Sequence, residues 1–212
     1  VLHDRVSFAI ERGDHGAALE PAVTGWTLAG DALAHDALVT AVSNNAVLLG
    51  QSGRFDEAVS LLAQAESAFG ADAELTLRRQ ELLHNQVVYF VESGDLDRAE
   101  LLLSDPSRSP LFDPADRLEL QVWVIHVRAD LSARKTDFPA AAATIAEGIA
   151  KLGTVGDLLD AYEVYTHNAF AQLYNARRFD EAKTLLEAAL VRHPTSRVIR
   201  ADLDATLKAM GR

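Results

Sequence analysis

The sequence contains Gly53-Arg54-Phe55-Asp56-Glu57-Ala58, a hexapeptide that decides the fold because variants of it return along the whole chain. The variants are Gly13-Asp14-His15-Gly16-Ala17-Ala18, Gly94-Asp95-Leu96-Asp97-Arg98-Ala99, Thr136-Asp137-Phe138-Pro139-Ala140-Ala141 and Arg177-Arg178-Phe179-Asp180-Glu181-Ala182. The final alanines are Ala18, Ala58, Ala99, Ala141 and Ala182, so the copies follow one another after 40, 41, 42 and 41 residues. A nearly constant period of this length indicates a repeat architecture.

Each hexapeptide has the composition of a turn between two helices. Gly53 and Gly94 accept the positive φ that follows a helix C-terminus, and acidic residues such as Asp56 suit the N-terminus of the next helix. Four segments before the turns lack internal proline and, except for Gly50, lack glycine; they are residues 36–52, 73–93, 114–135 and 157–176. Four residues after each of the last four alanines, a large aliphatic side chain continues a helical stripe. Each repeat is therefore predicted to be a helical hairpin.

A single hairpin cannot bury its apolar face, so neighbouring hairpins must stack. We therefore predict an all-α fold, a right-handed α-α solenoid that spans residues 1–212 as one domain. Its five hairpins are expected at residues 1–30, 31–70, 71–112, 113–153 and 154–193, and a C-terminal capping helix at residues 194–210.

Three local features refine this prediction. Pro106 should shorten the second helix of the third repeat, and residues 105–113 should form the longest connection. In the capping helix, Val198 or Ile199, then Leu203, Leu207 and Met210, share one stripe that leaves Asp202, Asp204 and Lys208 off it. Val1 falls inside the first expected helix with no start signal before it, which suggests that the native protein extends upstream.

The repeat resembles the tetratricopeptide repeat (TPR) family, in a long form of about 41 residues. The resemblance covers all five units and rests on the Gly-x-aromatic-x-x-Ala turn and on a small residue seven positions later, as at Ala65, Gly148 and Ala189. It implies a protein-binding or peptide-binding module whose first helices line a concave groove. The long form is also similar to sensor segments of bacterial transcription activators and peptide-pheromone receptors. No catalytic residue comes with the resemblance.

Composition narrows the classes of function. Lys and Arg total 20 and Asp and Glu total 31, so the formal charge is -11, which disfavours direct binding of nucleic acid by this segment. The chain has no cysteine, no signal peptide and no uninterrupted apolar run of membrane length. No phosphate-loop, His-Glu-x-x-His or Gly-x-Ser-x-Gly motif occurs. We expect a cytoplasmic protein that is no enzyme, contacts no membrane and needs neither cofactor nor metal.

An asparagine column is the first candidate for partner binding. Asn44, Asn85 and Asn168 lie fourteen residues before their anchor alanines, on the predicted groove face. An Asn side chain both donates and accepts, so it can hold a peptide backbone, as matching asparagines do in peptide-binding members of the family that this chain resembles. The alternative is that these amides satisfy backbone groups of the neighbouring helix.

A histidine column precedes the asparagines by one residue. It holds His3, Ser43, His84, His126 and His167. These side chains could contact an anionic ligand or sense pH, in which case affinity should change as pH crosses about 6.5. The alternative is that histidine suits a half-wet helix face and was inherited by repeat duplication. The spacing does not favour a zinc site.

Further residues complete the predicted groove. They are Trp123, Asp130, Arg134 and Tyr174. The leading hypothesis is an interaction module that holds a protein or peptide in the groove. The alternative is a ligand-sensing or signalling-peptide-sensing domain of a bacterial transcriptional regulator, which would require an upstream effector domain.

Overall fold

The computed structural model describes residues 5, 8–9, 12, 14–70 and 72–211, and in these residues every regular element is a helix. The chain divides into two compact units, the first ending at Arg117 and the second beginning at Leu118. The prediction of an all-α fold is confirmed. The first helix of the first repeat was expected before Gly13, and most of it lies outside the described residues.

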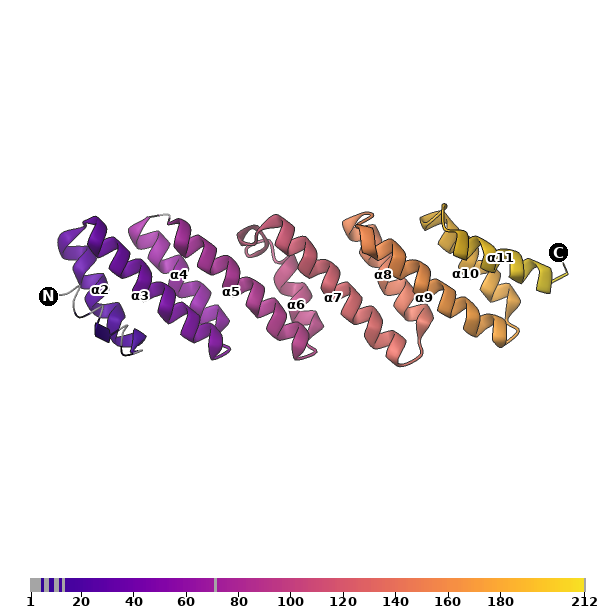
Figure 1. Ribbon diagram of the computed structural model, residues 1–212, viewed down its shortest axis with the longest axis horizontal. Helices are drawn as coiled ribbons and strands as arrows, with labels where there is room; N and C mark the ends of the chain where they lie inside the picture. Colours follow the sequence, from indigo (N-terminus) through magenta and orange to yellow (C-terminus); the bar gives the residue numbers. More distant parts are fainter. Residues whose placement is uncertain (1–4, 6–7, 10–11, 13, 71, 212) are drawn as a thin grey trace. The chain divides into compact units, whose positions relative to one another are not determined.

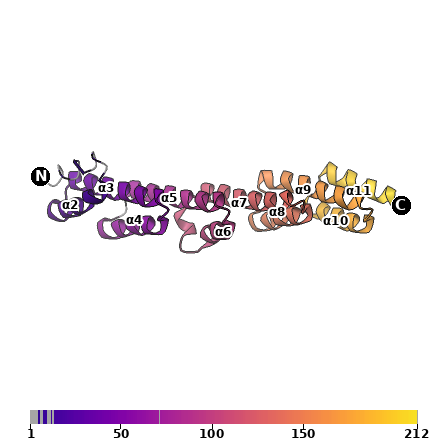
Figure 2. The same cartoon turned by 90° about the horizontal axis from the view of Figure 1, so that it is seen from below.

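The first unit contains helical hairpins whose helices form two layers. Its elements are α2 (His15–Ala29), α3 (Ala32–Gln51), α4 (Phe55–Phe69), α5 (Ala73–Glu92), α6 (Leu96–Ser104), the 3-10 turn η1 (Ser109–Leu111) and the start of α7 (Pro114–Arg134). Within this unit, α3 and α5 lie in one layer, and α4 and α6 in the other (Figures 1 and 2). Helix α3 packs against α2, α4 and α5.

The second unit repeats this arrangement. It contains the rest of α7, α8 (Phe138–Leu152), α9 (Gly156–Asn175), α10 (Phe179–Arg192) and α11 (Arg197–Ala209). Helix α9 packs against α8, α10 and α11. In Figure 2, α9 and α11 share one layer of this unit, and α8 and α10 share the other.

The hexapeptide turns have one backbone geometry. The N–H of the second hexapeptide residue donates to the carbonyl five residues earlier, in pairs Asp14 to Ala9, Arg54 to Leu49, Asp95 to Phe90, Asp137 to Ser132 and Arg178 to Leu173. The residue before each of the last four donors has a positive φ. Gly53 and Gly94 adopt this conformation readily, whereas Thr136 and Arg177 adopt it at φ 60° and 56° despite their side chains. The fold therefore imposes the turn even where the sequence lacks glycine.

Small residues allow the helices to approach closely. All five anchor alanines are fully buried. A Cβ on Gly148 of α8 would lie 2.8 Å from Cδ1 of Ile125 on α7. A Cβ on Gly50 of α3 would lie 2.6 Å from Cδ2 of Leu82 on α5. The predicted small-residue position at Gly148 thus contributes to packing, and Gly50 of α3 is also buried.

The irregular third repeat matches its prediction. Helix α6 covers only Leu96–Ser104, and the connection after it is ordered by η1 and by the buried side chain of Phe112. Arg108 Nη1 in this connection donates to Asp56 Oδ1 of α4 at 2.7 Å. That hydrogen bond, aided by one from Gln86, holds the pKa of Asp56 below its usual value.

Helix α11 corrects one detail of the prediction. Ile199 is fully buried, as expected, but Asp202 and Thr206 are also buried, whereas Leu207 is only half-buried. Asp202 was predicted to lie off the buried stripe, and a carboxylate is rarely buried without a partner. The structure supplies that partner, which is His167 of α9.

Helix α3 is the one helix in the described part of the chain that has the length and mean composition of a membrane span. The sequence showed no uninterrupted apolar run here because Asp36, Ser43, Asn44 and Asn45 break it. Eight residues of α3 are buried among its neighbours, and core helices of globular proteins can have the same length and apolar composition.

Candidate functional site

Two neighbouring hollows flank α5 in the first unit. The first encloses about 340 Å³ between α3 and α5, and the start of α4 contributes to it. Its lining combines apolar and polar side chains: Val47, Gly50, Gln51, Phe55, Arg78, Glu81, Leu82 and Asn85. Phe55, from the turn hexapeptide, and Leu82 are buried and close the floor of this hollow.

The second hollow encloses about 490 Å³ between α5 and the start of α7. It is lined by Leu77, Gln80, Glu81, His84, Asn85, Asp113 and Asp116. Glu81 and Asn85 line both hollows, so they form the ridge between them. The structure therefore brings the two predicted residues Asn85 and His84 together with Leu77, Gln80, Asp113 and Asp116, which were not predicted.

Carboxylates dominate the second hollow. Asp113 caps α7, because its Oδ1 accepts from the N–H groups of Ala115 and Asp116. Asp116 Oδ1 lies 2.8 Å from His84 Nδ1. Glu81 is paired with Arg78 at 2.6 Å, and Arg78 lies on the side of the first hollow. The lining of the second hollow thus carries three carboxylates and one imidazole, whereas Arg78, the cation paired with Glu81, lines the first hollow.

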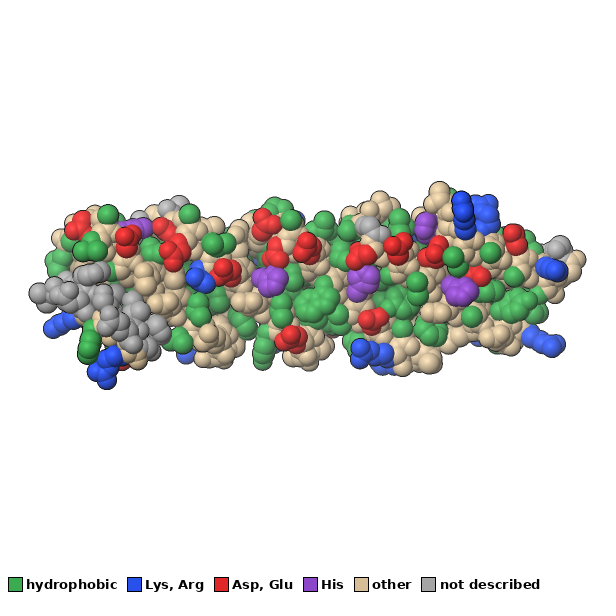
Figure 3. Space-filling view, viewed as in Figure 1, with side chains coloured by type: hydrophobic (Ala, Val, Ile, Leu, Met, Phe, Trp, Pro, Cys, Tyr) green, Lys and Arg blue, Asp and Glu red, His purple; other side chains and the backbone are tan. Residues whose placement is uncertain are grey.

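The histidine column connects successive repeats. His84 of α5 contacts Asp116 of α7 in the first unit, and His167 of α9 contacts Asp202 of α11 at 2.8 Å in the second. Nε2 of His126 on α7 lies 3.5 Å from Oδ2 of Asp157 on α9, which is an ion-pair distance. This Nε2 atom is buried and makes no hydrogen bond to a described residue. Figure 3 shows histidine and acidic side chains together over these helices. These contacts join helices of successive repeats, and His3 of the column lies outside the described residues.

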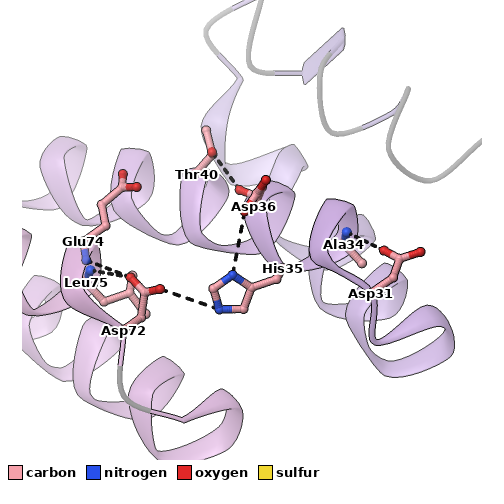
Figure 4. Close-up of polar contacts among 8 residues, drawn as sticks. All are labelled: Asp31, Ala34, His35, Asp36, Thr40, Asp72, Glu74 and Leu75. Atoms are coloured by element: carbon pink, nitrogen blue, oxygen red, sulfur yellow. Dashed lines mark hydrogen bonds and ion pairs between the residues drawn. The ribbon is translucent and has the colours of Figure 1, made fainter.

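A fourth histidine makes a comparable contact outside the predicted column. His35 of α3 lies 3.7 Å from Asp72, the N-cap of α5, and 3.9 Å from Asp36 (Figure 4). The Asp72 side chain also accepts from the N–H groups of Glu74 and Leu75. The sequence held a signal for two of the acidic partners: Asp116 and Asp157 both lie twenty-five residues before their anchor alanines.

The asparagine column differs from the histidine column. Asn85 is exposed, and Asn44 and Asn168 are half-buried. Within the described part of the chain, none of these three side-chain amides makes a hydrogen bond, whereas the adjacent Asn45 donates to the Ala41 carbonyl at 2.9 Å. The alternative interpretation, in which these amides satisfy a neighbouring helix, has no contact to support it among the described residues.

The remaining predicted residues lie in the second unit, and only some of them contact one another. Trp123 and Arg134 are exposed, on α7. Asp130 accepts a hydrogen bond from the Tyr165 hydroxyl, and burial together with this bond raises the pKa of Tyr165 to about 12. Tyr174 is half-buried and packs against Phe170 and Phe179, each at 5.3 Å between ring centroids. Tyr174 therefore contributes to packing between α9 and α10.

A third hollow lies in the second unit on the layer of second helices. It encloses about 310 Å³ and is lined mainly by small residues of α8 and α10, together with Glu147, Tyr162 and Arg192. It contains none of the predicted groove residues.

No protein-family model matches this chain, and no curated protein matches it in sequence.

Proposed function

We propose that this chain is a tetratricopeptide-like helical-repeat protein that binds a peptide or protein segment on the face formed by its first helices. The observation that carries the proposal is the position of Asn85. Its exposed amide stands on the ridge between two hollows and has no hydrogen-bond partner among the described residues. An amide in that position can donate to and accept from an extended backbone lying across α5.

Exposed apolar side chains on the same helices support the proposal. Leu77 is 56% exposed at the second hollow, and Leu48 of α3 is 40% exposed. In the second unit, Trp123 of α7 and Val164 of α9 are exposed and lie at equivalent repeat positions. A surface that mixes apolar side chains with a few unpaired polar groups is typical of protein interfaces.

A sensor function is the alternative. The volumes of the two hollows fall within the range of small-molecule pockets. In that case a compact ligand or a short signalling peptide would occupy one hollow, and the chain would control a regulator attached to it or associated with it. A peptide-binding module would instead engage both hollows and the ridge between them. No observation here calls for a catalytic role, and we propose none.

The experiment is peptide selection followed by substitution. A displayed library of random dodecapeptides is selected on the purified chain, and the affinity of the enriched peptides is measured for the wild type and for Asn85→Ala, Asn168→Ala and the double variant. If the asparagines hold a peptide backbone, Asn85→Ala and the double variant should weaken peptides bound across α5 by about fivefold to tenfold while the melting temperature stays nearly unchanged. Asn168→Ala should do the same for peptides bound on the second unit.

The matched control is Asn175→Ala, because Asn175 is exposed at the end of α9 and lies outside both hollows and outside the asparagine column. It should bind like the wild type. Full binding by the double variant, or failure of the library to return any peptide, would contradict the proposal. A ligand that loses affinity with substitutions in one hollow only, and not with Asn85→Ala, would favour the sensor alternative.

A further inference from the structure

We infer that the segment bound across α5 is basic and amphipathic, with an arginine or lysine seated in the second hollow and an apolar side chain in the first. This inference rests on the proposed function and adds the chemical class of the partner. It follows from the charges and the unused hydrogen-bonding groups of the two hollows.

The second hollow contains carboxylate oxygens that accept no hydrogen bond from the described residues. Asp113 and Asp116 each use Oδ1 for the contacts to backbone N–H groups and to His84, and their Oδ2 atoms accept no hydrogen bond within the described part of the chain. A carboxylate can accept about four hydrogen bonds. Two carboxylates with free oxygens therefore stand where a donor-rich side chain would satisfy both.

The net electrostatic balance of this hollow is negative. Its carboxylates are Glu81, Asp113 and Asp116, and no Lys or Arg is among its lining residues. Arg78 neutralises Glu81 from the neighbouring hollow. The N-terminus of α7 adds only about half a positive charge. The carboxylates therefore outweigh the positive contributions, and the potential favours a cationic guest over a neutral or acidic one.

The first hollow favours an apolar side chain of the bound segment. Val47, Phe55 and Leu82 form an apolar wall, while Arg78 is already paired with Glu81. An apolar side chain can be buried there without leaving a charge unpaired. Because Glu81 and Asn85 separate the two hollows, a bound segment would carry its cationic and apolar side chains on either side of a backbone held at Asn85.

Arginine should bind better than lysine. The guanidinium group presents five N–H donors in a fixed plane and can contact two carboxylates at once, whereas an ammonium group acts as a compact point charge. Replacing the key arginine of a bound peptide with lysine should weaken binding, and replacing it with glutamate should abolish binding.

The test uses the random dodecapeptide library on the whole chain. Enriched peptides should carry an arginine or lysine near an apolar residue, and their affinity should fall as sodium chloride is raised. Asp113→Asn and Asp116→Asn should each weaken these peptides by about fivefold or more. Asparagine retains an acceptor oxygen for the α7 cap and for His84, so both variants should fold.

The matched control is Asp137→Asn, which removes the same charge from the N-cap of α8 and belongs to the lining of neither hollow. It should bind like the wild type. If the enriched peptides are neutral or acidic, or if both hollow variants bind like the control while Asn85→Ala still loses binding, the inference falls and the proposed function stands. A library that yields no peptide, or peptides unaffected by any of these substitutions, would contradict both.

Discussion

His167 on α9 and Asp202 on α11 are joined by Nδ1 and Oδ2 at 2.8 Å, and this contact spans two successive repeats. His84 and Asp116 make the equivalent link from α5 to α7 in the first unit. Asp202 is almost fully buried, whereas the His167 side chain is 48% exposed. The carboxylate therefore depends on the imidazole for a partner that solvent cannot fully replace.

This relationship predicts a measurable coupling between the two residues. A double-mutant cycle of His167→Ala and Asp202→Ala in urea unfolding should give an interaction free energy of about 1 kcal/mol, because the pair is charge-assisted yet half open to water. The control cycle pairs His167→Ala with Asp204→Ala, since Asp204 is exposed on another side of α11. It should give no coupling, and equal values for the two cycles would contradict the assigned contact.

The left-handed turns predict substitutions that stabilise the chain. Arg177→Gly and Thr136→Gly should each raise the free energy of unfolding by about 0.5–1 kcal/mol, because both residues hold a positive φ that glycine adopts without steric strain. Conversely, Gly94→Ala should lower it by a similar amount or more.

Lys135→Gly is the control for this prediction, since Lys135 is also exposed in the same turn but has no positive φ. It should lower stability or leave it unchanged. A Lys135→Gly variant that gains as much as Thr136→Gly would show that chain flexibility, and not the turn conformation, is responsible.

The close approach of Gly148 to Ile125 predicts that the effect of Gly148→Ala on stability changes sign when Ile125 is shortened. Gly148→Ala gains about 1 kcal/mol from helix propensity but forces a methyl group to 2.8 Å from Ile125 Cδ1, an overpacking that costs about 1–3 kcal/mol. The single variant should therefore be destabilised in thermal or urea unfolding. In an Ile125→Ala background the same change should become stabilising, since the obstructing atoms are gone. Equal effects in the two backgrounds would contradict the close packing of α7 and α8.

The pKa of Tyr165, raised to about 12 by burial and by the hydrogen bond to Asp130, predicts an alkaline effect on stability. An unfolded tyrosine ionises near pH 10. The contribution of the protonated Tyr165 to the free energy of unfolding is therefore fully present below pH 10 and is lost as pH rises from about 10 to 12. Ultraviolet titration of tyrosinate absorbance, compared with Tyr165→Phe, should show one tyrosine ionising near 12. In Asp130→Asn that value should fall only part of the way towards 10, because burial is the larger cause.

The helices and turns were predictable because their signals are local. A positive φ at Gly53, an N-cap at Asp95 and an aliphatic stripe through Leu62 each depend on residues within one or two helical turns. The anchor alanines were equally predictable, because they recur at nearly the same spacing in every hairpin. The stacking of all five hairpins into one solenoid remains a prediction.

The candidate site was predicted only in part. Asn85 and His84 were found because each belongs to a column that recurs in other repeats, but Leu77, Asp113 and Asp116 come from other turns and from the connection that breaks the period. The burial of Asp202 was missed because its partner lies thirty-five residues away, on another helix. Spacing along one helix cannot show which carboxylate a histidine on the next helix will contact.

The residues alone thus determined that this chain forms helical hairpins at a period of about 41, since that outcome follows from turn conformation and helical periodicity. Tertiary packing decided what the histidine and asparagine columns contact. It placed His84 and His167 against carboxylates of the next repeat and left the amide of Asn85 without a partner in the described structure. The reason is geometric: the position of a side chain on its own helix follows from sequence spacing, whereas its neighbours across the interface depend on how two helices are packed together.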